Sequence, residues 1–174
     1  MVKIAPSILA ADLMDMTNEI KLVDANGADY IHIDVMDGHY VNNIAFGPNM
    51  VKSMRPHTKK ILDVHLMISP VKKFVDEFIA AGADIISFHP DADKNSRDIL
   101  NQIKSANCKA GIAIHPKISI NEIVSFLDLI DIVIVMTVVP GFGGQKFMQS
   151  EVNKIIELSK IRKKRNLSYE IEID

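Results

Sequence analysis

Short runs rich in Ile and Val recur along this chain of 174 residues, separated by segments in which apolar residues have helical spacing. Apolar runs of about four to eight residues are typical of strands buried on both faces, as in parallel sheets covered by helices. The pattern predicts strands at residues 4–7, 30–36, 61–67, 85–89, 110–115, 132–138 and 169–174. We therefore expect repeated strand–helix units around one parallel sheet.

The intervening segments predict helices at residues 14–25, 71–81, 96–106, 120–127 and 150–165, with a shorter one at 48–54. Two of the helix–strand junctions repeat, as Gly27-Ala28-Asp29 and Gly82-Ala83-Asp84. In each, the glycine suits the left-handed position that ends a helix. The repeat indicates similar joints around one sheet, and it is compatible with an open sheet or a closed barrel.

The charge and cysteine content restrict the possible partners and compartment. Twenty Lys and Arg against 22 Asp and Glu leave a net charge of −2, so neither nucleic acid nor a membrane is expected as a partner. The single cysteine, Cys108, excludes an internal disulfide framework and fits a reducing compartment. The longest apolar run, residues 130–139, is too short to cross a bilayer. With no visible secretory signal or linker, we expect one cytoplasmic domain over residues 1–174.

Polar residues occupy alternate positions in several of these apolar strands. Because side chains alternate between the two faces of a strand, each polar row lies on one face. The rows are His32, Asp34 and Met36, then Asp63, His65 and Met67, and finally Glu170, Glu172 and Asp174. Active sites of barrels and open α/β sheets lie at the carboxyl ends of the strands, so we expect a charged cavity there.

Two histidines and two aspartates from three of these strands could hold one divalent cation. Imidazole and carboxylate ligands suit Zn²⁺ or Fe²⁺, and the lack of clustered thiols excludes a cysteine-based zinc site. A histidine in a strand can equally be a hydrogen-bonded core residue, and Met36, Met67 and Met136 can be adaptable core filler. The spacing alone leaves these alternatives open.

A glycine-rich loop, Pro-Gly-Phe-Gly-Gly-Gln at residues 140–145, follows the predicted strand at 132–138 and precedes a helix. Three glycines in four residues let backbone N–H groups approach an anion without obstruction by Cβ atoms. The loop has neither the Walker A spacing nor the dinucleotide-binding spacing. Its composition favours a phosphate-binding loop over a plain turn.

Taken together and in order, these motifs resemble those of the ribulose-phosphate 3-epimerase family, one of the ribulose-phosphate-binding barrels. The resemblance extends from Ile4 to Asp174. It is carried by residues 5–12 (APSILAAD), 32–38 (HIDVMDG), 46–48 (FGP), 63–67 (DVHLM), 81–84 (AGAD), His89 and 140–145 (PGFGGQ). The resemblance implies an α/β fold of the TIM (β/α)₈ barrel type.

The resemblance also implies a role for each matching residue. His32, Asp34, His65 and Asp174 would bind one divalent metal ion, and Asp34 and Asp174 would be the catalytic acid/base pair. Substrate contacts would come from Ser7, His65, Met36, Met67, Met136, Gly141, Phe142, Gly143 and Gly144, the last four at the phosphate. His89 would support the site.

The family interconverts D-ribulose 5-phosphate and D-xylulose 5-phosphate, a step of the pentose phosphate pathway, by inverting carbon 3. The resemblance thus implies a metal-dependent epimerase that moves protons through an enediolate of a phosphorylated ketopentose. The ion would be Zn²⁺ or Fe²⁺, with Mn²⁺ or Co²⁺ as further candidates, and the assembly a homo-oligomer, a dimer or a larger even number. Two alternatives remain: an epimerase of another ketose phosphate, such as allulose 6-phosphate, and a catalytically inert phosphosugar-binding fragment.

The length bears on how much of a barrel the chain holds. A complete (β/α)₈ barrel usually takes about 250 residues, with about 200 as a lower figure. The seventh predicted strand ends at Asp174. We therefore expect a single barrel domain that is incomplete at its C-terminal side, lacking the last strand–helix unit.

Overall fold

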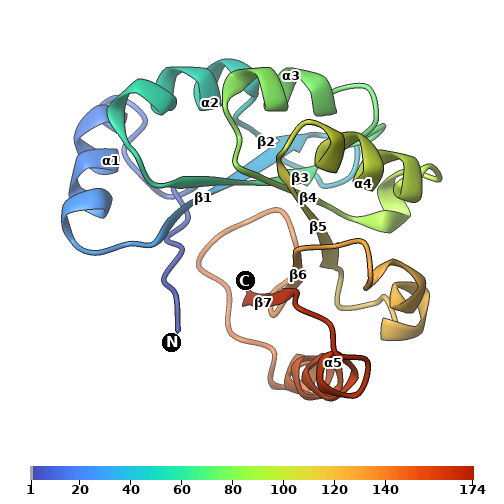
Figure 1. Ribbon diagram of the computed structural model, residues 1–174. Helices are drawn as coiled ribbons and strands as arrows, with labels where there is room; N and C mark the ends of the chain where they lie inside the picture. Colours follow the sequence, from blue (N-terminus) through green and yellow to red (C-terminus); the bar gives the residue numbers. More distant parts are fainter. Residues whose placement is uncertain (1) are drawn as a thin grey trace.

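The computed structural model describes residues 2–174, and its central feature is one curved sheet of seven strands (Figure 1). The strands are β1 (Tyr30–Asp37), β2 (Ile44–Ala45), β3 (Ile61–Met67), β4 (Ile85–Phe88), β5 (Lys109–Ile114), β6 (Ile132–Val135) and β7 (Glu170–Ile173). Their order is β2-β1-β3-β4-β5-β6-β7, and every pair is parallel except β1 and the short β2. The predicted parallel sheet of strand–helix units is confirmed.

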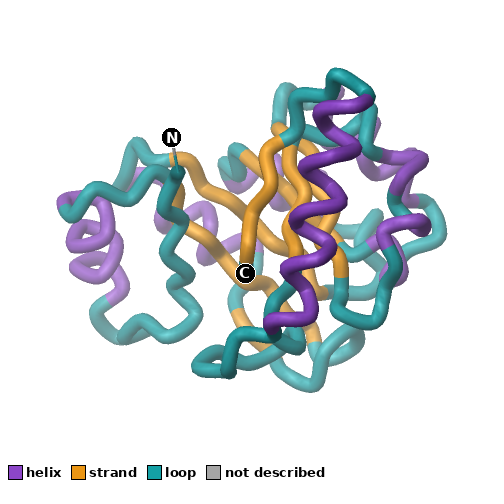
Figure 2. The backbone as a smooth tube through the Cα atoms, turned by 90° about the horizontal axis from the view of Figure 1, so that it is seen from below, coloured by secondary structure: helices purple, strands orange, loops and turns teal. Residues whose placement is uncertain are grey.

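The helices lie on the outer side of this sheet, as Figure 1 shows. They are α1 (Met16–Ala25), α2 (Pro48–Met54), α3 (Val75–Ala81), α4 (Ser96–Ser105) and α5 (Val152–Lys164). Figure 2 shows α5 running alongside the strands at the carboxyl-terminal end of the chain. No helix within residues 2–174 combines the length and apolar character needed to cross a membrane.

The two faces of the sheet have different chemistry because the strand residues alternate between them. The outward residues of β1 and β3, such as Ile33 and Val64, are fully buried against the helices in the main hydrophobic core. The inward residues begin with an apolar layer of Tyr30, Ile85 and Ile132. Above that layer the inner face becomes polar, which is where the predicted rows lie.

The register of β1 and β3 brings the two predicted polar rows side by side. The paired positions are His32 with Asp63, Asp34 with His65, and Met36 with Met67. Parallel neighbours in this register present their inward side chains at the same level of the sheet. From the amino to the carboxyl ends of the strands, the inner face is therefore first apolar, then charged, and finally lined by methionine.

Some predicted elements take another form. Residues 4–7 form no strand: they run beside β1 with one bridge, Ser7 to His32, because Pro6 has no N–H to donate. The helix predicted at 120–127 is two 3₁₀ turns, Ile120–Glu122 and Val124–Phe126. The apolar spacing of three between Ile120 and Ile123, both buried, fits 3₁₀ geometry. Three further 3₁₀ turns are Arg55–His57, Pro90–Ala92 and Gln149–Glu151.

Element ends also differ from the predictions. α3 begins four residues later than expected, after the turn that follows Pro70, and β6 ends at Val135 rather than at residue 138. The two-residue strand β2 was not predicted, because two residues carry no periodic signal.

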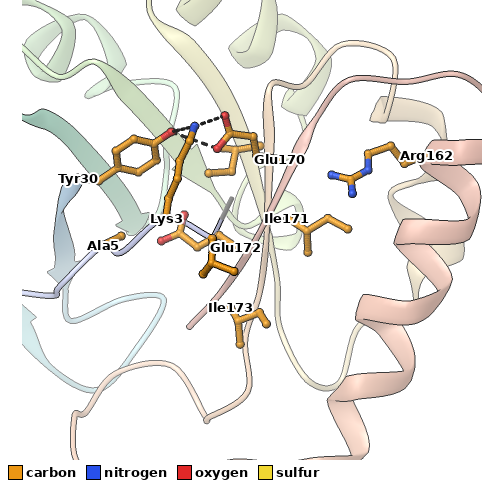
Figure 3. Close-up of a pocket in the computed structure, with 10 residues that line it drawn as sticks. Lys3, Ala5, Tyr30, Arg162, Glu170, Ile171, Glu172 and Ile173 are labelled. Atoms are coloured by element: carbon orange, nitrogen blue, oxygen red, sulfur yellow. Dashed lines mark hydrogen bonds and ion pairs between the residues drawn. The ribbon is translucent and has the colours of Figure 1, made fainter. Parts of the chain in front are cut away.

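The N-terminal segment and β7 approach each other on the inner side of the molecule. Lys3 Nζ donates to Glu170 Oε1 at 2.6 Å and to the Tyr30 hydroxyl at 2.7 Å, as Figure 3 shows. A cavity of about 580 Å³ lies beside this contact, with Ile132 and Ile171 in its walls. Within residues 2–174, β7 pairs only with β6. The expectation of a single domain lacking one strand–helix unit stays a prediction.

Gly111 of β5 lies on the inner face where there is no room for a side chain, and it provides a stability test. A Cβ added there would lie 2.5 Å from Ile132 Cγ2 and 2.8 Å from Ser87 Cβ. Because both neighbours belong to the sheet, Gly111→Ala is expected to lower the free energy of unfolding by about 1–3 kcal/mol in urea titrations. Gly143→Ala is the control, since its added methyl would meet nothing within 4 Å. Equal losses in both variants would contradict this account of the packing.

Candidate active site

Four residues on the inner face converge into one cluster: His32 and Asp34 of β1, His65 of β3, and Asp174 directly after β7. One nitrogen or oxygen atom from each lies within 4.8 Å of the others. His32, Asp34 and His65 are buried, whereas the Asp174 side chain is 28% exposed. The four residues predicted to bind metal are thus brought together, with Asp174 as the most accessible member.

Asp34 is the centre of the hydrogen-bond network in this cluster. The Ser7 hydroxyl donates to Asp34 Oδ2 at 2.7 Å, and His65 Nδ1 lies 3.1 Å from Oδ1. His32 Nε2 is 3.4 Å from the same Oδ1. Burial alone would raise the pKa of Asp34, but the hydrogen bonds and charges of the two histidines outweigh it and hold that pKa far below its ordinary range. Asp34 is therefore an ionised carboxylate at neutral pH.

His32 is held from its other ring nitrogen by two further acids. Nδ1 lies 2.8 Å from Asp63 Oδ2 and 3.2 Å from Glu172 Oε1. Burial would lower the pKa of His32, but the charge of Asp63 and the hydrogen bonds of the surrounding carboxylates hold that pKa well above its ordinary value. Burial, with the charge of Asp63, raises the pKa of Glu172. The ring of His32 is thus fixed between acids on both sides.

His65 contacts a third histidine. Its Nε2 lies 2.9 Å from Nε2 of His89, which directly follows β4 and is fully buried. The ring of Tyr40 stacks on His89 with centroids 4.6 Å apart. Burial is the main cause that holds the pKa of His89 well below its ordinary value, and the neighbouring charges of His65 and His115 add to it. His89 is therefore a neutral ring wedged between Tyr40 and His65.

Asp174 is positioned through its main chain. Its N–H donates to the Val135 carbonyl at 3.2 Å, and its main-chain oxygen accepts from the N–H and hydroxyl of Thr137 at 2.6 and 2.7 Å. The carbonyl of Thr137 in turn accepts the N–H of Met148 at 2.7 Å. The side chain reaches to 3.8 Å from His65 Nδ1. Thr137 thus connects Asp174 to the end of β6 and to the segment after the glycine-rich loop.

The donor set fits a divalent cation. Two imidazole nitrogens and two carboxylate oxygens are ligands suited to Zn²⁺ or Fe²⁺. Within residues 2–174, His32 Nε2 is buried and lies 3.4 Å from Asp34 Oδ1 without the geometry of a well-formed hydrogen bond, so a metal ligand bond would satisfy it. The same strand face also supplies Asp63 and Glu172 as hydrogen-bond partners behind the cluster. The residues present therefore fit a single metal ion.

A cavity of about 270 Å³ lies above the cluster and brings together most of the predicted substrate contacts. Its walls include Ser7, Asp34, Met36, Met67, Met136, Gly141, Phe142, Gly143, Gly144 and Asp174. The three methionines are at most 2% exposed. His65 does not line this cavity, because it is fully buried behind Asp34. The roles of these residues toward a substrate stay predictions.

The glycine-rich loop takes a conformation that only glycine adopts readily at two positions. Gly141 and Gly144 have φ angles of 124° and 72°. The Asn43 side chain donates to the Gly141 carbonyl at 2.8 Å, and Gln145 Nε2 donates to the Phe142 carbonyl at 2.7 Å. Asn43 from another part of the chain and Gln145 at the end of the loop therefore hold the loop in place beside the cavity.

Asp63, Glu172 and Thr137 contribute to the site, although the family motifs assign no role to them. The alternating pattern places Asp63 and Glu172 on the inner face, and that shared face is the signal that could have identified them. Thr137 gives no such signal, because its contact with Asp174 depends on how β6 and β7 end.

Comparison with known proteins identifies the family. The model of the ribulose-phosphate 3 epimerase family matches residues 3–174. A ribulose-phosphate 3-epimerase of Rhodobacter capsulatus is 48% identical over 88% of this chain and 68% of its own length. That of Bacillus subtilis is 45% identical over 99% of this chain and 81% of its own length. The chloroplastic ribulose-5-phosphate-3-epimerase of Arabidopsis thaliana is 43% identical, and this chain covers 62% of it.

Solved structures support the fold independently. A mutant tryptophan synthase α-subunit from Pyrococcus furiosus has a TM-score of 0.68 at 12% identity, covering 96% of this chain and 84% of that one. A tryptophan synthase from Mycobacterium tuberculosis has a TM-score of 0.57 at 10% identity, covering 98% of this chain and 83% of that one. Such similarity shows the TIM-barrel fold alone. The family match, the sequence identity and the barrel topology together establish that this chain belongs to the ribulose-phosphate 3-epimerase family of isomerases.

Proposed function

We propose that the protein is a metal-dependent epimerase that interconverts D-ribulose 5-phosphate and D-xylulose 5-phosphate at carbon 3. One observation carries the proposal: two carboxylates, Asp34 and Asp174, reach the same four-donor cluster from different strands and line the same cavity. Inversion of a carbon next to a ketone requires one group to remove its proton and another to return a proton on the opposite face. Two separately held carboxylates meet that requirement.

The surroundings of Asp34 suit it to proton transfer. Its carboxylate is ionised because the two histidines hold its pKa far below the ordinary range, and the ionised form is the protonation state that a base requires. The Ser7 hydroxyl donates to Oδ2 and fixes the orientation of the carboxylate. Asp174, fixed through Thr137, is the partner that returns the proton on the other face. In the reverse reaction the two residues exchange roles.

The intermediate is an enediolate of the sugar, and its negative charge needs stabilisation. Held by His32, Asp34, His65 and Asp174, Zn²⁺ or Fe²⁺, with Mn²⁺ or Co²⁺ as further candidates, would supply Lewis-acid stabilisation of that charge. Met36, Met67 and Met136 would exclude water from the reacting carbons without adding a titrating group. The chain would thus supply the proton-transfer groups, the cation ligands and methionine side chains that exclude water.

The loop Gly141–Gly144 is the proposed site for part of the phosphate. Its positive φ angles at Gly141 and Gly144 and its place at the cavity rim suit backbone N–H groups turned toward an anion. A sugar phosphate bound there would extend toward Asp34 and Asp174. A homo-oligomer, either a dimer or a larger even-numbered assembly, remains part of this proposal.

Replacement of the two carboxylates tests the mechanism. Asp34→Asn and Asp174→Asn are each expected to lower kcat/KM in a coupled epimerase assay by about 10²–10⁴-fold, since each removes one proton-transfer group. Asp98→Asn, at an exposed aspartate that pairs with Lys72, is the matched control and should be unchanged. An unchanged rate in Asp34→Asn would rule out two-carboxylate chemistry. Absence of turnover in the unmodified, metal-loaded chain would favour an inert phosphosugar-binding fragment.

Metal removal tests the cofactor. Dialysis against a chelator should abolish turnover, and added Zn²⁺ or Fe²⁺ should restore it, because the enediolate charge would otherwise be unbalanced. His32→Gln should bind less metal in elemental analysis of protein purified without oxygen, whereas His39→Gln, at a 74%-exposed side chain, should not. Full activity in metal-free protein would contradict the proposal.

Comparison of two substrates tests the specificity. We expect measurable turnover of ribulose 5-phosphate and a lower kcat/KM for allulose 6-phosphate, whose extra carbon changes the distance from the phosphate to the reacting carbon. The two rates should be measured on the same metal-loaded preparation. Turnover of allulose 6-phosphate alone would replace the pentose assignment with that alternative.

A further inference from the structure

Both histidines of the proposed metal site are held at the ring nitrogen that faces away from it. His32 uses Nδ1 to contact Asp63 at 2.8 Å, and His65 uses Nε2 to contact His89 at 2.9 Å. All four of these side chains are buried. A carboxylate often accepts a hydrogen bond from the outer ring nitrogen of a metal-binding histidine. At His65 an imidazole takes that place, and an imidazole accepts a hydrogen bond only at a nitrogen that carries no proton.

The geometry at His65 restricts where its proton can be. Nδ1 faces the cluster, 3.1 Å from Asp34 Oδ1 and 3.8 Å from Asp174 Oδ2. Nε2 faces His89 at a distance that requires a proton between the two nitrogens. A neutral imidazole has one N–H and one lone pair, so a ring that binds a cation through Nδ1 carries its proton on Nε2. His89 Nε2 must then be the acceptor, and His89 must carry its own proton on Nδ1, a buried nitrogen with no hydrogen-bond partner within residues 2–174.

We propose that His89 is a positioning residue of the metal site: it accepts the Nε2–H of His65 and thereby fixes the tautomer in which His65 Nδ1 is free to bind the metal. This inference rests on the metal site of the proposed function. His89 does not line the cavity above the cluster, and among the four proposed ligands its only hydrogen bond within residues 2–174 is to His65. It acts on the metal only through that ring.

The surroundings of His89 suit this role because they hold its ring in one orientation. The Tyr40 ring stacks on it with an interplanar angle of 27°, and the Tyr40 hydroxyl is anchored by donation to Asp91 at 3.1 Å. His115 packs against its edge with centroids 6.4 Å apart. The acceptor nitrogen is therefore held in place by packing as well as by His65.

A neutral acceptor also limits the buried negative charge. Asp34, Asp63 and Glu172 already place three acids on the inner face around His32. A fourth acid behind His65 would add an anion at a fully buried position, and a buried anion without a partner is costly. An imidazole accepts the same hydrogen bond without that charge.

Metal affinity of the full chain tests the proposal. His89→Leu removes the acceptor, and calorimetric titration of the metal-free protein with Zn²⁺ should show binding weakened by about 10–100-fold. His89→Gln places an amide oxygen near the same point and should lose less than about tenfold. His115→Gln, next to His89 but outside its hydrogen bond to His65, should bind Zn²⁺ as the unmodified protein does.

Tautomer states provide a second measurement that does not depend on any variant. In the Zn²⁺-loaded protein, nitrogen NMR of the histidine rings should show His65 protonated at Nε2 and His89 protonated at Nδ1.

A proton on Nδ1 of His65, or equal Zn²⁺ affinity in folded His89→Leu, would overturn the proposal. So would a loss in His89→Gln as large as that in His89→Leu. If His89→Leu does not fold, as judged by thermal melting, the NMR and His89→Gln results decide. Failure of the unmodified protein to bind Zn²⁺ would instead refute the metal site itself.

Discussion

The in-register pairing of β1 with β3 is the constraint on which the rest of the site depends. It sets His32 beside Asp63 and Asp34 beside His65, so charged groups that would be costly alone are buried as pairs. A slip of one residue would turn these side chains toward the apolar helices and bring Ile33 and Val64 inside. The hydrophobic outer face therefore specifies the register, and the register brings the charged side chains of the site together.

The charged layer on the inner face lowers the stability of the fold, and the apolar packing around it compensates for this loss. Three acids surround His32, and Asp63 and Glu172 each retain one buried oxygen without a partner among residues 2–174. Such groups lower stability relative to a hydrocarbon interior. The apolar layer of Tyr30, Ile85 and Ile132 below and the main core outside supply the packing that keeps this level folded. The polar layer in turn holds the proposed metal ligands and proton-transfer groups in fixed positions.

Much of the site follows from alternation along single strands, because that pattern depends only on local geometry. His32, Asp34, His65 and Asp174 were predicted on this ground and from the family resemblance, and they lie in one cluster. What alternation cannot supply is the pairing between strands, so the contacts of Asp63 with His32 and of Thr137 with Asp174 needed the structure. In two places local chemistry overrode the apolar pattern. Pro6 prevented the strand predicted at residues 4–7, and the spacing of Ile120 and Ile123 gave 3₁₀ turns in place of the helix predicted at residues 120–127.

Thr137 holds both the main-chain oxygen of Asp174 and, through its own carbonyl, the N–H of Met148. The segment that contains the glycine-rich loop thus begins and ends at Thr137, the residue that fixes Asp174, one of the two proposed acid/base groups. With the phosphate held in that loop as proposed, one anchor sets both ends of the substrate. The end of β6 would then fix the distance between the phosphate and the reacting carbon, and this distance would select the number of carbons between them.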